Sequence, residues 1–215
     1  MEFSTKYHDQ SFPEQYATKH RETVFRRLND HREKRLLAKS LAKIQPPDSL
    51  IDVGCGPGRF WPVLCKTPAT TLCGLDVSHS MLAFARDHQP DGGHFLTTSG
   101  SVTQLPFADA AFDCVVAMRL LHHFGEVEER AQAISELRRI ARRNVIVSLW
   151  VDGNYKAWRR QALEKRRSAR SYQNRHVFKR EVLHQEFTEA GLNVRHHLDL
   201  LPGYSQWRYY VLECV

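Results

Sequence analysis

A glycine-rich turn directly after a short apolar stretch constrains the fold of this chain more than any other feature. The stretch Leu50–Val53 predicts a buried strand, and Gly54, Gly56 and Gly58 follow it at once. Glycine permits both a tight turn and the close approach of a ligand to the backbone. A helix is expected next, over residues 60–65, and the first N–H groups of a helix can bind a ligand because they have no partner within the helix. The segment therefore predicts a strand–turn–helix unit with a ligand at the turn.

Predicted strands and helices alternate along the rest of the chain. Further strands are expected at residues 71–75, 95–98, 112–118, 145–149, 192–201 and 206–212, and helices before Gln45 and at residues 80–88, 126–141 and 181–190. Alternation of this kind favours a parallel sheet with helices on both faces. Only a short turn joins the last two strands, so they should pair antiparallel. We therefore expect an α/β, Rossmann-like three-layer sandwich with a seven-stranded, mostly parallel sheet whose last strand is antiparallel.

One segment accounts for the basic character of the chain. The net charge is +7, and residues 156–180 alone carry ten basic side chains and one acidic side chain. Solvated surface charge is the usual explanation for such a run. The five cysteines form no C-x-x-C pair, so we expect reduced thiols and no metal site. The longest apolar runs are too short to span a bilayer and the N-terminus has no secretory pattern, so we expect a cytoplasmic protein.

Residues 52–58, DVGCGPG, resemble motif I of class I S-adenosylmethionine-dependent methyltransferases. Dinucleotide-binding folds use G-x-G-x-x-G instead, whereas the third glycine here comes one residue early. Asp76 ends the second predicted strand, where a carboxylate can accept hydrogen bonds from both hydroxyls of a ribose. A role as an ordinary helix cap is the alternative for such an aspartate. The resemblance covers residues 50–149 and implies S-adenosylmethionine as the cofactor.

Two further blocks extend the resemblance to the family. Residues 100–113 are similar to its G-D-A-x-x-L-P-F…F-D block, except that Ser101 stands where the family has the aspartate that binds adenine. A hydroxyl accepts a hydrogen bond more weakly than a carboxylate. Residues 118–124, MRLLHHF, occupy the place of the family's V-x-x-x-L-H-H sequence. The resemblance thus implies a cofactor site made by Asp52, Gly54, Cys55, Gly56, Gly58, Asp76, Val77, Ser101, Val102, Met118 and Arg119.

The histidine pair after the fourth strand is the candidate for catalysis. His122 or His123 could act as a general base, because histidine titrates near neutral pH. Capping of the next helix, or packing beneath the loop, is the alternative for either ring.

The remaining segments are expected to surround the methyl acceptor. We expect one domain over residues 1–215, with an N-terminal helical lid (1–45), a cofactor-binding core (50–150), a basic insertion (151–180) and a C-terminal helix and strand pair (181–215). In the family, the N-terminal segment often folds over the cofactor, and the insertion after the fifth strand usually completes the acceptor pocket. The candidate substrate-binding residues are Tyr7, Tyr16, Tyr155, Trp158, Arg159 and Tyr172.

Three functions remain open from the sequence. The first is methyl transfer to a small or lipid-linked anionic acceptor, since arginine binds carboxylate and phosphate through paired hydrogen bonds. The second is modification of tRNA or another RNA, with the basic segment neutralising phosphates and its aromatic residues stacking on bases. A similarity of the H-H-F and H-x-F patterns to tRNA wobble-uridine methyltransferases supports this alternative. The third is an inactive binding subunit that keeps the fold.

Overall fold

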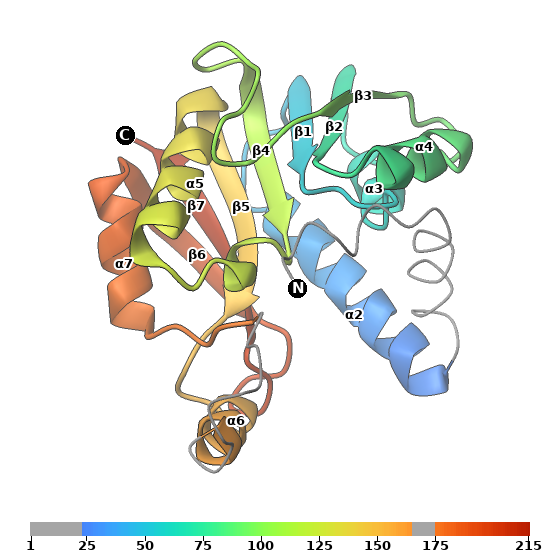
Figure 1. Cartoon of the computed structure of the whole chain (residues 1–215). Coiled ribbons are helices and arrows are strands. Elements are labelled where there is room, and N and C mark those ends of the chain that lie inside the picture. The colour runs from blue at the N-terminus through green and yellow to red at the C-terminus, as the bar shows by residue number, and fades with distance from the viewer. Residues whose placement is uncertain (1–22, 165–174) are drawn as a thin grey trace.

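A central seven-stranded sheet organises the protein, and the computed structural model describes residues 23–164 and 175–215 (Figure 1). Its strands are β1 (Ser49–Val53), β2 (Thr71–Asp76), β3 (Phe95–Ser99), β4 (Phe112–Met118), β5 (Ala141–Trp150), β6 (Leu192–Asp199) and β7 (Trp207–Cys214). The helices are α2 (Val24–Leu41), α3 (Trp61–Leu64), α4 (His79–Asp87), α5 (Val127–Ile140), α6 (Tyr155–Glu164) and α7 (Arg180–Glu189), with a short 3-10 helix, η2 (Leu121–His123).

The strand order is β3-β2-β1-β4-β5-β7-β6. β1 pairs in parallel with both β2 and β4, and the pairs β2–β3 and β4–β5 are parallel as well. β7 runs antiparallel to β5 and β6, which lie on either side of it. The expected α/β fold, with a mostly parallel sheet and an antiparallel last strand, is confirmed. The last strand of the chain is thus an inner strand of the sheet.

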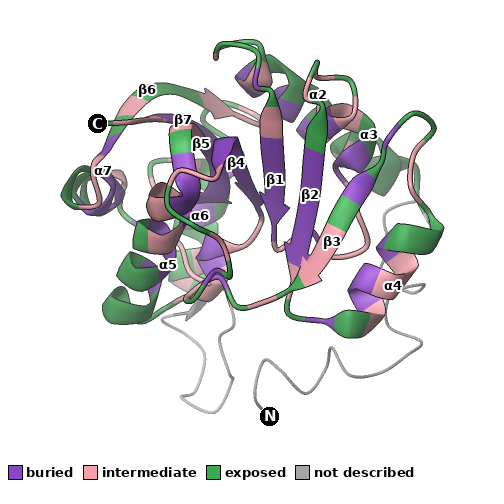
Figure 2. Ribbon diagram, turned by 90° about the horizontal axis from the view of Figure 1, so that it is seen from above, coloured by how far each residue is buried: buried purple, intermediate pink, exposed green. Residues whose placement is uncertain are grey.

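Helices cover both faces of the sheet and give three layers. On one face, α2, α3 and α4 place residues such as Leu37, Trp61 and Leu82 in one hydrophobic cluster with β1 and β4. On the other face, α5 and α7 contribute Ile134 and Phe187 to a second cluster. Figure 2 shows the inner strands buried between these layers. β4 is buried along its whole length, which explains why its sequence is a continuous apolar run.

The two neighbours of β1 create the crevice in which ligands bind in folds of this kind. The chain leaves β1 towards β2 on one side and returns to β4 on the other, so the connections diverge at the carboxyl ends of these strands. In Figure 1, α2 and α6 both lie beside this edge of the sheet. Sequence periodicity predicted no helix over Tyr155–Glu164. Its apolar side chains mostly face solvent, so they produce no core-facing pattern.

Candidate active site

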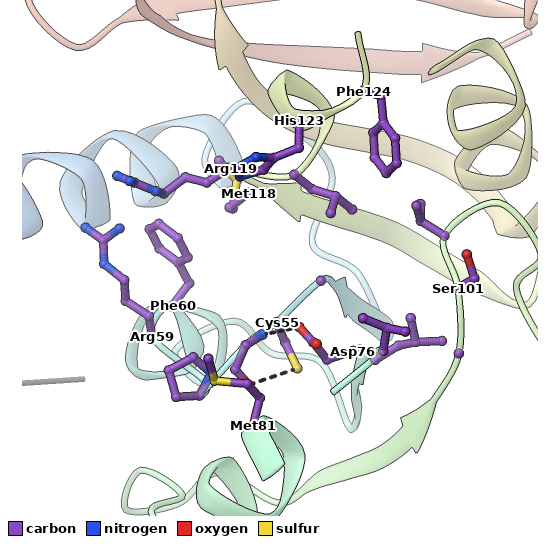
Figure 3. Close-up of a pocket in the computed structure, with 18 of the residues that line it drawn as sticks. Cys55, Arg59, Phe60, Asp76, Met81, Ser101, Met118, Arg119, His123 and Phe124 are labelled. Carbon is purple, nitrogen blue, oxygen red and sulfur yellow. Dashed lines mark hydrogen bonds between the residues drawn. The ribbon is translucent and has the colours of Figure 1, made fainter. Parts of the chain in front are cut away.

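A cavity of about 420 Å³ opens at the carboxyl edge of β1, β2 and β4 (Figure 3). Most of the predicted cofactor residues lie in its wall, namely Gly54, Cys55, Gly56, Asp76, Val77, Ser101, Val102, Met118 and Arg119. Other residues of the wall are Pro57, Arg59, Phe60, Leu75, Met81, Gly100, Leu120, His123, Phe124 and Glu129. The structure therefore brings together three sequence blocks that are far apart in the chain.

The glycine loop after β1 is held by the end of β2. The N–H groups of Gly54 and Cys55 both donate to the carbonyl oxygen of Leu75, at 2.7 and 3.0 Å. Gly56 has a φ of +54°, and a side-chain carbon at this position would find no atom within 4 Å. The space above Gly56 is thus open, and a ligand can approach the loop there.

Asp76 closes the loop from the end of β2. One carboxylate oxygen accepts from the N–H of Gly56 at 2.7 Å and the other accepts from the N–H of Ser78 at 2.9 Å. Burial raises the pKa of Asp76, and these backbone donors act in the opposite direction. Each carboxylate oxygen can accept a second hydrogen bond. The carboxylate is therefore fixed in the cavity wall and still able to bind hydroxyl groups.

Asp52 lies beneath the loop and is absent from the cavity wall described above, as is Gly58. Asp52 is only 1% exposed. Burial first, and the charge of Asp76 second, raise the pKa of Asp52 to about 7. Asp52 and Gly58 are thus the two predicted cofactor residues outside the cavity wall. Asp52 is buried close enough to Asp76 for their charges to interact.

Ser101 marks one end of the cavity (Figure 3). Its hydroxyl lies 2.8 Å from the Thr103 hydroxyl and also accepts from the N–H of Thr103 at 3.3 Å. The neighbouring wall is apolar, with Val77, Met81 and Val102. This end therefore offers a flat ring an apolar environment with one hydroxyl at its rim.

Two arginines occupy the opposite end, where acidic residues of α2 hold them (Figure 3). Glu33 is buried and pairs with Nη1 of Arg59 at 2.9 Å and with Nη1 of Arg119 at 3.0 Å. Asp30 pairs with Nε of Arg59 at 2.7 Å. The backbone of Arg119 has a φ of +61°, and its N–H donates to the hydroxyl of Ser148. These contacts fix the direction of both guanidinium groups.

Sequence reasoning missed the acidic pair on α2. Asp30 and Glu33 lie three residues apart, on one side of a helix that is otherwise rich in Lys and Arg. That spacing is the one signal in the sequence that could have indicated a buried ion-pair network.

Comparison with known proteins agrees with this geometry. Residues 51–149 match the sequence model of the family described as "Methyltransferase domain". Residues 51–149 thus have the sequence of a methyltransferase domain. The match agrees with the resemblance of the glycine loop to class I enzymes that use S-adenosylmethionine as cofactor.

Relatives of this methyltransferase domain act on different acceptors. The 18S rRNA (guanine(1575)-N(7))-methyltransferase of Saccharomyces cerevisiae is 34% identical over 83 residues, which are 39% of this chain and 30% of the relative. A malonyl-[acyl-carrier protein] O-methyltransferase of Methylococcus capsulatus is 28% identical over 157 residues, 70% of this chain and 55% of the relative. The chain spans between 20% and 55% of the length of the curated relatives compared.

A solved structure confirms the fold over most of the chain. The magnesium protoporphyrin IX methyltransferase of Synechocystis, crystallised with S-adenosylhomocysteine, superimposes with a TM-score of 0.72. Its sequence is 16% identical, and the superposition covers 90% of this chain and 88% of that chain. At this identity the likeness establishes the fold of the methyltransferase domain and leaves the acceptor open.

The two histidines of the methyltransferase domain lie in different surroundings. His123 is part of the cavity wall. The ring of His122 is buried and packs against Trp150 and Trp207, with ring centroids 5.1 and 5.0 Å away. Burial first, and the neighbouring His123 and Arg119 next, lower the pKa of His122 far below its ordinary range. His122 is therefore neutral, and of the two rings only His123 reaches the cavity.

Trp150 and Trp207 form an aromatic pair beside the cavity, and guanidinium groups cover it. The two rings are 5.6 Å apart. Arg119 lies 4.6 Å from the Trp207 ring, while Arg160 and Arg175 lie 4.7 and 5.7 Å from the Trp150 ring. Because Arg119 also belongs to the cavity wall, this group extends from the cavity towards α6. We call these five residues the arginine–tryptophan cluster.

The three predicted substrate-binding residues that the structure describes are not part of the cavity wall. Tyr155, Trp158 and Arg159 lie on α6 and are exposed to solvent. Tyr7, Tyr16 and Tyr172 lie outside the described residues. Sequence reasoning did not single out Trp150, Trp207 or Arg160 as a unit, because tertiary contacts bring them together from β5, β7 and α6.

Proposed function

We propose that this domain transfers the methyl group of S-adenosylmethionine to an anionic acceptor that is small or lipid-linked. The observation that carries the proposal is the arginine–tryptophan cluster. It begins at Arg119 in the cavity wall and continues through Trp207 and Trp150 to the guanidinium groups of Arg160 and Arg175. Arginine presents paired donors that match carboxylate and phosphate groups. An anion beside the cavity would thus be held by groups that are already oriented.

The motifs imply one orientation of the cofactor in the cavity. We assign the ribose hydroxyls to Asp76, the adenine ring to the apolar end near Val102 and Ser101, and the methionine end to Met118 and Arg119. The open space above Gly56 accommodates the ligand where any side chain would fill it. The orientation directs the reactive methyl group towards the arginine–tryptophan cluster.

For this reaction the protein mainly has to align the acceptor atom with the methyl group. S-adenosylmethionine supplies an activated methyl group on a positively charged sulfur. With the cofactor held by Asp76 and the glycine loop, an acceptor atom placed in line with the methyl group would take it, and the electron pair of the carbon–sulfur bond would stay with sulfur as a neutral thioether. An ionised carboxylate or phosphate has no proton to lose, so positioning is the main contribution of the residues around it. A neutral, buried His122 is consistent with such a reaction, and His123 would serve an acceptor that must lose a proton.

RNA is the alternative acceptor. The ten basic residues between Lys156 and Arg180 support it, since lysine and arginine neutralise phosphates in any nucleic acid. Relatives named as rRNA and tRNA methyltransferases support it too. The third function, a binding subunit without activity, has less support because Gly54, Gly56, Gly58 and Asp76 are all present.

Methyl-label transfer into fractions of a cell extract tests the proposal. Purified protein with labelled S-adenosylmethionine should label an anionic metabolite or lipid fraction, and nuclease treatment should not remove the label. Arg160→Gln should raise the KM for the acceptor in the labelled fraction by about tenfold, because one charge-assisted hydrogen bond is lost. The affinity for S-adenosylmethionine should stay unchanged. Lys66→Gln, an exposed cation on the other flank, is the matched control.

Two outcomes would reject the proposal. Label that enters RNA and disappears with ribonuclease would establish the alternative. Cofactor binding in calorimetry with no label in any fraction would identify a binding subunit.

A further inference from the structure

The outer face of α6 carries an apolar stripe that points into solvent. Tyr155 is 48% exposed, Trp158 is 67% exposed and Leu163 is 48% exposed. A helix turns about 100° per residue, so these three side chains fall within an arc of about 140° on the side of α6 that faces solvent. Ala157, on the opposite side, is buried against the protein. A surface helix normally turns its apolar side to the core, so the outward stripe calls for a partner surface.

The stripe continues onto the turn between β6 and β7. The Tyr204 ring stacks on the Tyr155 ring, with centroids 5.7 Å apart and 12° between the planes. The N–H groups of Tyr155 and Lys156 donate to the carbonyl oxygens of Gly203 and Tyr204, at 2.9 and 3.0 Å. The first turn of α6 is therefore anchored to the sheet, and the exposed rings are held in place.

Cations border the stripe. Lys156 is exposed, and its ammonium group lies 5.1 Å from the Tyr204 ring centroid, while Arg159 is exposed between Trp158 and Leu163 in the sequence. Tyrosine and tryptophan combine an apolar body with a polar tip, and lysine and arginine have long apolar stems. This combination is the one that lies at the boundary between lipid headgroups and acyl chains.

We infer that the outer face of α6, with Tyr204, docks on the surface of a bilayer that contains anionic lipid. Basic side chains beside an amphipathic helix are attracted by the negative surface of such a bilayer. Within residues 23–164 and 175–215, no helix is long and apolar enough to cross a membrane, so the contact is peripheral. In Figure 1, α6 lies beyond the edge of the sheet at which the cavity opens. Docking there would bring a lipid-linked acceptor to the cavity, and to this extent the inference rests on the proposed function.

The same surface suits a nucleic acid less well. Base stacking requires free ring faces, whereas the rings of Tyr155 and Tyr204 already stack on each other. An exposed aliphatic side chain such as Leu163 adds nothing to base stacking and contributes to burial in lipid. The exposed side chains lie along one side of a single helix, so they can contact a flat surface together.

Co-sedimentation of the full chain with vesicles tests the inference without cofactor or acceptor. Binding is compared for phosphatidylcholine alone and for phosphatidylcholine mixed with phosphatidylglycerol. The wild type should bind the mixed vesicles much more strongly. Lys156→Ala with Arg159→Ala should lower the partition constant about 30-fold, from roughly 1 kcal/mol for each cation. Trp158→Ala with Leu163→Ala should lower it about tenfold, and acyl-chain-brominated lipid should quench the fluorescence of Trp158.

Controls separate docking from folding and from the proposed function. The control variant Lys66→Ala with Leu96→Ala removes one exposed cation and one exposed apolar side chain on the other flank, and should bind like the wild type. Calorimetry with S-adenosylmethionine shows that each variant is folded. Equal binding to both vesicle types, or no loss in the α6 variants, would overturn the inference. So would tighter binding to tRNA than to vesicles that is lost in the same variants. Because no acceptor is used, failure here leaves the test of methyl transfer intact.

Discussion

Replacing Gly56 by alanine should separate cofactor binding from stability. The φ of Gly56 is +54°, a region that costs an L-residue about 1–2 kcal/mol. The new methyl group meets no protein atom within 4 Å, so packing adds nothing to this cost. The same methyl group occupies the space where the cofactor approaches the loop. We therefore expect a loss of about 1–2 kcal/mol in the free energy of unfolding, but more than tenfold weaker binding of S-adenosylmethionine.

Gly58→Ala is the matched comparison within the same loop. Its φ is +74°, and the added carbon would lie 2.9 Å from two ring atoms of Trp61. That ring is fully buried and stacks on Phe95 at 4.2 Å, so it cannot move aside. Overpacking of about 1–3 kcal/mol adds to the backbone strain, so Gly58→Ala should lose about 2–5 kcal/mol of stability.

Urea denaturation measures the stability of both variants, and isothermal titration calorimetry measures cofactor affinity. The reasoning is refuted if Gly56→Ala keeps the wild-type affinity for S-adenosylmethionine. It is equally refuted if the two variants lose the same amount of stability.

Two further predictions concern buried charges. Burial and the charge of Asp76 raise the pKa of Asp52 to about 7, above its unfolded value of about 4. The folded state then keeps a proton that the unfolded chain releases, so the free energy of unfolding should fall as pH rises from about 4 to about 7. Asp52→Asn should flatten this slope in urea titrations. Parallel slopes in both proteins would contradict the reasoning. Arg130 and Glu186 form a buried ion pair between α5 and α7, so Glu186→Gln should cost about 3–5 kcal/mol in thermal or urea unfolding. Glu189→Gln, exposed on the same helix, should cost less than about 0.5 kcal/mol, and equal losses in the two variants would show that the pair is not the cause.

Local patterns in the sequence predicted most of the secondary structure. β4 begins and ends where its apolar run predicted, because a strand covered on both faces requires apolar residues throughout. Ser78 caps α4 by accepting from the N–H of Met81, an ordinary role for a serine that precedes a helix. The alternation of strands and helices predicted the parallel sheet, and the short turn before the final strand predicted its antiparallel pairing.

Local patterns could not predict features that depend on solvent-facing side chains or on contacts between residues far apart in the sequence. The helix α6 was missed because its apolar side chains face solvent, which removes the periodic core signal. The position of β7 between β5 and β6 depends on pairing over long sequence separations. The burial of His122 between two tryptophans has the same origin, because these rings come from β5 and β7.

The division between sequence and structure follows the range of the interactions. The turn at Gly54–Gly58 depends on backbone geometry within a few residues, so the sequence alone predicted the loop and, by resemblance, its cofactor. Asp76 reaches the same loop only because β1 pairs with β2. Which charges gather beside the cavity was decided by the tertiary structure. It placed Glu33 against Arg59 and Arg119 and set Arg160 and Arg175 over Trp150. Side chains from separate elements meet only after the sheet has formed, and no local pattern in the chain encodes their meeting.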